Sequence, residues 1–210
     1  MRRNLRWLVF TAVALVGVAC ADTDTVLSPE AEALASRGSE MHGGGSQQST
    51  AQFEIRWMQN MIDHHHMAVM MAEICLQKAV HPELKTLCEN IIAAQTREIR
   101  QMQGWLRDWY GITYEPQMKP GDMRQMEKMA ALSPTEFEIA FMEEMIRHHR
   151  MAIMEAQMAL RKASHEELKQ LARDIIRTQS QEIQQMRTWL CQWYNRCRGM
   201  EMGGGMGMGM

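Results

Sequence analysis

Apolar side chains recur every three to four residues along four stretches of this chain, which is the spacing of amphipathic helices. The four expected helices run over approximately residues 50–79, 82–110, 134–162 and 165–195. Capping-box motifs open two of them, at Ser49-Thr-Ala-Gln52 and at Ser133-Pro-Thr-Glu136.

The chain contains the same helical hairpin twice. Residues 53–110 recur at 137–194 without a gap, and more than half of the aligned positions are identical. The offset is 84 throughout, as between His64 and His148. Because one two-helix hairpin buries little apolar surface, we expect the two tandem hairpins to close on each other. The predicted fold is therefore all-α, a four-helix bundle built from two helical hairpins.

Composition and the repeat divide the chain into six segments. In order, they are a signal peptide or lipobox at 1–20, a flexible tether at 21–48, the first hairpin repeat at 49–110, a linker with a short helix at 111–132, the second hairpin repeat at 133–197 and a Met/Gly-rich tail at 198–210. We expect the two repeats to form one bundle domain.

The N-terminus has the pattern of an export signal. Residues 1–6 are basic, and residues 7–19 are apolar but too few to span a bilayer. Val18-Ala19-Cys20 resembles a bacterial lipobox, although Gly17 stands where Leu is usual. We expect export to the cell envelope or periplasm with a lipid anchor on Cys20; cleavage without lipidation is the alternative.

Charge excludes some partners, and methionine content suggests others. The formal net charge of −2 provides no case for nucleic acid and no basic face for a membrane surface, so a lipid anchor is the membrane contact we expect. Methionine, with 23 residues, is far above ordinary usage. It fills helical cores well, but the tail has no helical period with which to build a core.

Four cysteines remain after Cys20, and an exported protein can oxidise them. Cys75 and Cys88 lie equally far from the first turn, near 81–82, so they should face each other in the hairpin and form a disulfide. The second repeat has Ala159 and Ala172 at these places. We expect a second, local disulfide between Cys191 and Cys197. The alternative is that some of these thiols bind copper.

The apolar stripes contain a polar layer. His65 lies in the middle of the first helix's stripe, and Glu98 lies within that of the second. Folding each hairpin about its turn places four pairs opposite each other: His65 and Glu98, Met61 and Met102, His149 and Glu182, and Met145 and Met186. Either the His–Glu pairs are buried hydrogen bonds that fix register, or the layer is a metal site inside the bundle, with Glu98, Glu182, Met102 and Met186 as supporting or alternative ligands.

The other histidine of each pair lies at the edge of the stripe. Met67 follows His64 at i+3, with Met71 one turn further, and Met151 follows His148 in the same way. Such a pair presents an imidazole nitrogen and a thioether sulfur on one helical face. Thioethers suit Cu(I), while imidazole also accepts Cu(II). Methionines placed by chance on exposed positions are the alternative explanation.

The remaining histidines are not expected to be principal metal ligands. His66 is replaced by Arg150 in the second repeat, so we expect at most an auxiliary role. His81 and His165 recur at the two turns, where a turn or capping role is expected.

The paired motifs resemble those of a known family. Met61-Ile-Asp-His-His-His-Met-Ala-Val-Met and Met145-Ile-Arg-His-His-Arg-Met-Ala-Ile-Met, each followed by Glu-x-x-x-Met-x-x-Trp, are similar to the signature of bacterial domain-of-unknown-function family 305, with its CopM-like exported copper-binding proteins. The resemblance implies a ferritin-like bundle, copper binding through His and Met, and a role in copper tolerance. It supports these ligands: Met61, His64, His65, Met67, Met145, His148, His149 and Met151.

The sequence favours metal binding over catalysis. We expect a copper-binding protein of the cell envelope, not an enzyme, which sequesters Cu(I), with Cu(II) second, or hands it to a copper-accepting envelope protein. One alternative is a ferritin-like di-metal oxidase, but the Glu-x-x-His motif of such enzymes is absent from the four expected helices. The other alternative is a metal-free envelope scaffold.

Overall fold

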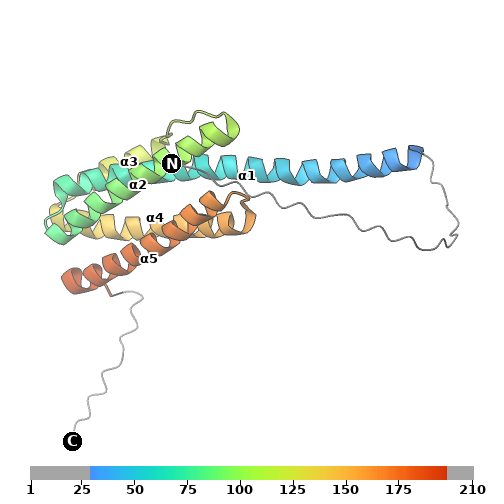
Figure 1. Ribbon diagram of the computed structural model, residues 1–210. Helices are drawn as coiled ribbons and strands as arrows, with labels where there is room; N and C mark the ends of the chain where they lie inside the picture. Colours follow the sequence, from blue (N-terminus) through green and yellow to red (C-terminus); the bar gives the residue numbers. More distant parts are fainter. Residues whose placement is uncertain (1–28, 198–210) are drawn as a thin grey trace, which may run out of the picture. The chain divides into compact units, whose positions relative to one another are not determined.

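The computed structural model describes residues 29–197, with side chains from Gln47 onward. The described residues form five helices and no strand: α1 (Pro29–Lys78), α2 (Pro82–Tyr110), α3 (Pro120–Ala130), α4 (Pro134–Lys162) and α5 (Glu166–Tyr194). Figure 1 shows α1, α2, α4 and α5 running alongside one another. The predicted all-α class and bundle are confirmed.

Local chemistry sets the helix boundaries. Proline, whose fixed backbone angle suits the first turn of a helix, is the first residue of every helix except α5. Gly111 ends α2 and Asn195 ends α5, each in the left-handed conformation, with φ of 65° and 55°. In the predicted capping box of α4, the Ser133 backbone N–H donates to Glu136.

The N-terminal part of α1 differs from the expectation. Helix was predicted from about residue 50 and a flexible tether at 21–48, but α1 begins at Pro29. Residues 30–35 are rich in Ala and Glu, which favour helix without any apolar period, so a search for an amphipathic pattern does not detect them. Helix propensity does not explain the continuation of α1 through Gly43-Gly44-Gly45. The compact unit that holds the bundle begins at Gly43.

Several expectations fall outside the described residues. These are the signal segment at 1–20 with Cys20, the part of the tether at 21–28 and the Met/Gly-rich tail at 198–210. Within the described range, no helix is both long and apolar enough to cross a membrane.

Buried polar residues divide the bundle core into two apolar clusters. One cluster includes Phe137, Phe141 and Leu84, and the other includes Trp57 and Leu106. On each of the four helices, the residues of the two clusters flank a short polar stretch. The buried polar side chains of these stretches are His65, Gln95, His148, His149 and Gln179. This central layer positions the candidate site.

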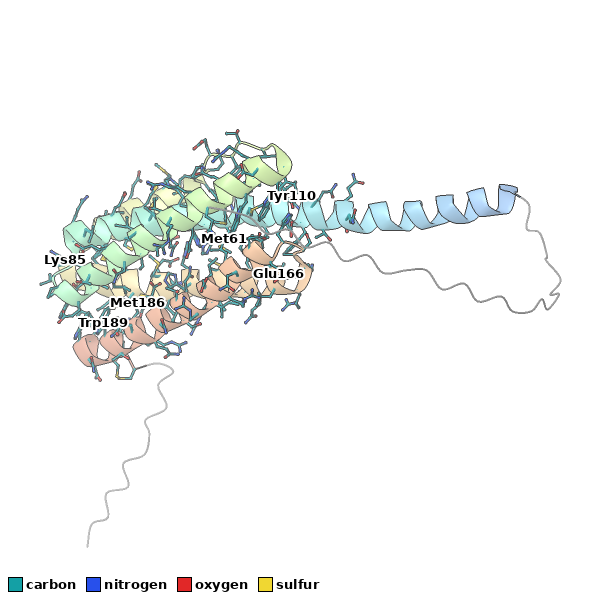
Figure 2. The ribbon with its side chains drawn as sticks, in the orientation of Figure 1. Met61, Lys85, Tyr110, Glu166, Met186 and Trp189 are labelled. Carbon is teal, nitrogen blue, oxygen red and sulfur yellow. A yellow bond between two sulfur atoms is a disulfide. The ribbon has the colours of Figure 1, made fainter. Side chains whose placement is uncertain are left out.

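A buried carboxylate in each repeat holds the turn of the other repeat. Glu54 of α1 accepts hydrogen bonds from the backbone N–H groups of Ser164 (2.6 Å) and His165 (3.1 Å) in the α4–α5 turn, and from His165 Nδ1 (2.7 Å). The Tyr110 hydroxyl donates to the same carboxylate. Figure 2 shows Tyr110 beside the start of α5 at one end of the bundle.

The second repeat makes the reciprocal contacts. Glu138 of α4 accepts from the backbone N–H groups of Val80 (2.6 Å) and His81 (2.8 Å), from His81 Nδ1 (2.7 Å) and from the Tyr194 hydroxyl. These bonds require α1 and α4 to run antiparallel, and they relate the two repeats by an approximate two-fold axis.

The turn histidines are also stacked on tryptophans. His165 lies against Trp109 with ring centroids 3.8 Å apart, and His81 lies against Trp193 at 3.9 Å, both nearly parallel. The predicted turn role of His81 and His165 therefore has a geometric basis. Both of them connect the two repeats.

The four described cysteines are paired. Cys75 and Cys88 form a disulfide within the first hairpin, and Cys191 and Cys197 form one at the end of α5. Cys75 and Cys88 are fully buried, so the first disulfide crosslinks α1 to α2 inside the core.

Changing Cys75 and Cys88 to alanine, the residue of the second repeat at both places, should lower the free energy of unfolding by about 2–3 kcal/mol. The reason is that the disulfide spans 13 residues and restricts the unfolded chain. Urea denaturation under oxidising conditions measures the change, and reductant should lower the wild-type protein to near the level of the variant. Equal stability of the two oxidised proteins would contradict this prediction.

Candidate metal-binding site

Two histidines, one from each repeat, meet face to face at the centre of the bundle. The rings of His64 on α1 and His148 on α4 have centroids 3.5 Å apart and are tilted by 32°. His148 is 1% exposed, and no nitrogen of either ring makes a hydrogen bond of good geometry, although each ring lies near the backbone of the other histidine. Buried polar atoms nearly always have partners. Each neutral ring has one lone pair and one N–H group, so the pair presents two imidazole lone pairs that a cation could accept.

The surroundings keep these rings uncharged. Burial lowers the pKa of His64 to about 3, and the neighbouring His65 and His149 oppose a positive charge there. Burial also holds the pKa of His148 well below its ordinary value, with the same opposition from the other imidazoles. A neutral imidazole is the form that binds metal ions.

The other two histidines are oriented by carboxylates. His65 Nε2 lies 2.6 Å from Glu98, and His149 Nε2 lies 2.6 Å from Glu182. Both Nδ1 atoms are buried without a partner. A carboxylate that holds the proton on Nε2 leaves the Nδ1 lone pair free, and many metal-binding histidines are oriented in this way.

The four imidazoles form one layer. Ring centroids of His64 and His65 are 6.2 Å apart, and those of His148 and His149 are 6.4 Å apart. The apolar period predicts one histidine of each pair inside the core and the other at the edge of the apolar stripe. In the structure, the antiparallel packing of α1 against α4 brings His64 and His148 together in the α1–α4 interface.

Thioether sulfur is available next to the His64–His148 pair. Met67 and Met151 line the same pocket as these two histidines, with a volume of about 440 Å³. Met67 is partly buried, while Met151 is 45% exposed. Met71 is fully buried in the adjoining apolar cluster and does not line this pocket, where its counterpart Glu155 does.

Four further methionines lie on either side of the layer. Met61 and Met102 belong to one apolar cluster, and Met145 and Met186 to the other; all four are fully buried. Figure 2 shows Met61 and Met186 inside the bundle. These are the pairs that folding the two hairpins about their turns had placed opposite each other.

The pocket in front of the His64–His148 pair is acidic. Its lining carries the carboxylates of Asp63, Asp122, Glu144 and Glu155 against one ammonium group, that of Lys119. Burial raises the pKa of Glu155. A concave surface with an excess of carboxylates raises the local concentration of cations.

Within residues 29–197, no three His, Cys, Asp or Glu side chains converge as a ready-made metal site. Thioether sulfur as well as imidazole nitrogen lines the pocket in front of this layer. The sets that could contribute are His64 and His148 with Met67 and Met151, and His65 and His149 through Nδ1. Soft or borderline cations suit this combination of ligands.

Comparison with known proteins identifies the family. The profile described as "Domain of unknown function (DUF305)" matches residues 54–190 and, in a second match, residues 138–210. The chain belongs to the DUF305 family. The second match of this DUF305 protein begins at residue 138, at the start of the second copy of the repeat. No curated protein matches the chain.

Solved structures of a protein named CopM resemble this one. CopM in its Cu(I)-bound form is 37% identical with a TM-score of 0.61, and the match covers 67% of this chain and 97% of CopM. The Cu(II)-bound form matches with the same values. A silver-bound form, obtained by co-crystallisation, is 38% identical with a TM-score of 0.60 over 67% of this chain and 97% of CopM.

Proposed function

We propose that this DUF305 protein binds copper in the central histidine layer and sequesters it or hands it on outside the cytoplasm. One observation carries the proposal. The rings of His64 and His148 face each other with all four nitrogens unpaired, and the thioethers of Met67 and Met151 line the pocket in front of them.

The ligand types favour Cu(I). Thioether sulfur is a soft ligand with little affinity for hard cations, while imidazole binds Cu(I) and Cu(II) as well as zinc. A site of two imidazoles and two thioethers is therefore most selective for the cuprous ion. His65 and His149, oriented by Glu98 and Glu182, could add nitrogen ligands for Cu(II).

The CopM structures support this assignment. CopM has been solved with Cu(I), with Cu(II) and with silver. Silver in its monovalent form shares the preference of Cu(I) for sulfur and nitrogen ligands. A chain 37% identical over nearly all of CopM is expected to bind cations of the same class.

We place the protein in the cell envelope. The basic and apolar residues at 1–19 form an export signal, and Cys20 lies where a lipid would be attached. In that compartment, copper bound by the layer would be kept from other ligands. This would contribute to copper tolerance, and a copper-accepting envelope protein would be the partner.

Two other functions are less well supported by the geometry. A di-metal oxidase needs Glu-x-x-His motifs together with further carboxylate ligands. The four bundle helices contain no Glu-x-x-His, and Glu98 and Glu182 each pair with a histidine. A metal-free scaffold would gain nothing from unpaired buried imidazoles, which destabilise a fold. We therefore propose binding as the function, without catalysis.

Changing Met67 and Met151 together to leucine should weaken Cu(I) binding by at least about 10-fold, while Cu(II) binding changes by less than about 3-fold. Leucine keeps the apolar volume and removes only the sulfur. Competition with a coloured Cu(I) chelator measures the first change, and competition with a Cu(II) chelator measures the second.

The matched control for this experiment is the change of Met154 and Met158 to leucine. Both are exposed methionines of α4, and neither lines the pocket. Equal loss of Cu(I) in the two variants would remove Met67 and Met151 from the proposed site.

A further inference from the structure

The first repeat has a groove that the chain itself fills. Residues 111–119, a non-helical segment between α2 and α3, lie against both helices of the first hairpin. Gln103 Nε2 of α2 donates to the carbonyl oxygen of Tyr114 at 2.9 Å. Asp63 of α1 accepts from the Tyr114 hydroxyl at 2.9 Å and from the backbone N–H of Gln117 at 2.7 Å. This segment is therefore anchored by one side chain of α1 and one of α2.

The second repeat has the corresponding groove with different anchors. The positions equivalent to Asp63 and Gln103 are Arg147 and Arg187. Both arginines line a pocket of about 600 Å³ between α4 and α5, which we call the α4–α5 groove. The other lining residues are Glu143, Ile146, Arg150, Leu190, Asn195, Arg196 and Cys197.

No part of the described chain occupies the α4–α5 groove as residues 111–119 occupy its counterpart. After α5 ends at Tyr194, the chain turns, and the disulfide between Cys197 and Cys191 returns it to α5. Residues 195–197 therefore form one edge of the groove.

The α4–α5 groove has a net positive charge. Four arginines and one glutamate line it. Arg147 pairs with Glu144 on its own helix, and Arg196 pairs with Glu143 at 3.0 Å. Among the described residues, Arg150 and Arg187 form no ion pair. The groove thus offers guanidinium N–H groups beside the buried apolar side chains of Ile146 and Leu190.

We propose that the α4–α5 groove binds an acidic, non-helical peptide segment of a partner protein, in the manner in which residues 111–119 occupy the corresponding groove of the first repeat. The exchange of Asp63 for arginine reverses the hydrogen-bonding requirement. Asp63 accepts from N–H and O–H groups, whereas Arg147 and Arg187 only donate, and they bind carboxylates and carbonyl oxygens. The occupant must therefore present acceptors and negative charge.

The charge of the groove also argues against the chain's own tail as its occupant. Residues 198–210 contain one acidic side chain, that of Glu201, and one basic side chain, that of Arg198. The side chains of this segment therefore carry no net negative charge to complement the unpaired Arg150 and Arg187. The inference does not depend on copper binding, because the groove residues are not among the proposed ligands.

The test is fluorescence anisotropy with a labelled peptide of about eight residues, the length needed to follow the groove as the linker does. Glutamate alternates with serine and proline in the probe, and glutamine replaces glutamate in a matched neutral peptide. We expect the acidic peptide to bind the full-length protein more weakly as salt increases, and the neutral peptide not to bind. Changing Arg147 and Arg187 to glutamine should weaken binding by at least about 10-fold.

The control variant replaces Arg124 and Arg161, two exposed arginines outside the groove, by glutamine. It removes the same charge and should change binding by less than about 2-fold. Circular dichroism verifies that each variant is helical. The single change Arg150→Gln provides a second test. Arg150 is exposed, so the change should not disturb folding, and the affinity for the acidic peptide should fall by at least about 3-fold.

Several results would overturn the proposal. One is equal loss of binding in the groove and control variants, which would show only a general effect of net charge. A second is displacement of the probe by a synthetic peptide of residues 198–210 at equal concentration, which would make the tail the occupant. A third is failure of the acidic peptide to bind while inorganic phosphate or phosphatidylglycerol vesicles bind in an Arg187-dependent way, which would make the groove a site for small anions or lipid headgroups.

Discussion

Replacing His64 and His148 together by leucine should make the metal-free protein more stable and abolish its stabilisation by Cu(I). Each ring buries two nitrogens without a partner, and an unsatisfied buried polar group costs about 1–3 kcal/mol. Leucine fills similar space without polar atoms. We expect the free energy of unfolding to rise by about 2 kcal/mol and the melting temperature by roughly 4–8 °C for a protein of this size.

The same variant should lose at least about 100-fold in Cu(I) affinity, because both imidazoles at the centre of the proposed site are removed. Thermal unfolding with and without Cu(I), combined with chelator competition, measures both effects. His66→Leu is the control, since it removes an imidazole next to the layer that does not line the pocket. A double variant that is less stable than the wild-type protein and still binds Cu(I) would show that the His64–His148 pair is structural.

Replacing Glu54 by glutamine should destabilise the protein by about 3 kcal/mol or more, because a buried network would lose its acceptor. The carboxylate receives bonds from Ser164, His165 and Tyr110. In glutamine, one oxygen becomes an NH₂ group that faces donors. The measurement is urea denaturation at neutral pH.

The pH dependence of stability should change in the same variant. Burial alone would raise the pKa of Glu54, but the hydrogen bonds from Tyr110, His165 and Ser164 prevail and lower it from 4.5 to about 2. A carboxyl whose pKa is lower in the folded protein stabilises it above the unfolded value, and this contribution is lost as the pH falls from about 4.5 towards 2. We expect wild-type stability to fall steeply in that range and the variant's to fall less.

The control for Glu54 is Glu73→Gln, an exposed carboxylate on the same helix. It should change the free energy of unfolding by less than about 0.5 kcal/mol. If Glu54→Gln has an equally small effect, or if its stability keeps the acid dependence of the wild-type protein, then the contacts of Glu54 do not hold the two repeats together.

The fold followed from the sequence because the repeat and the apolar period are local properties. Helix spacing indicated four bundle helices, and the position of each turn determined which residues of a hairpin face each other. Because they lie equally far from the turn, His65 and Glu98 face each other, with Nε2 of the histidine 2.6 Å from a carboxylate oxygen. The same counting could not detect the helical residues that begin at Pro29, because they have no apolar face.

The centre of the site could not be predicted because it depends on how one repeat packs against the other. Counting from a turn relates α1 to α2, but it says nothing of α1 against α4, where His64 meets His148. Glu54 and Glu138 were overlooked, although a signal existed. Each directly follows a Phe and recurs at the repeat offset of 84, and Tyr110 and Tyr194 recur at the same offset. A charged residue retained in both copies near an apolar stripe is a candidate for a buried interaction.

The reciprocal contacts of Glu54 and Glu138 bear on how the molecule could have arisen. Each hairpin has both elements of the same contact. A carboxylate near its start binds the turn of the other hairpin, and its own turn binds the carboxylate of that hairpin. Two identical hairpins could therefore associate as a symmetric homodimer, with the counterparts of His64 and His148 meeting on its two-fold axis. After fusion of such a dimer into one chain, the two hairpins could change independently of each other. They differ at their corresponding grooves, since residues 111–119 fill one and arginines line the other.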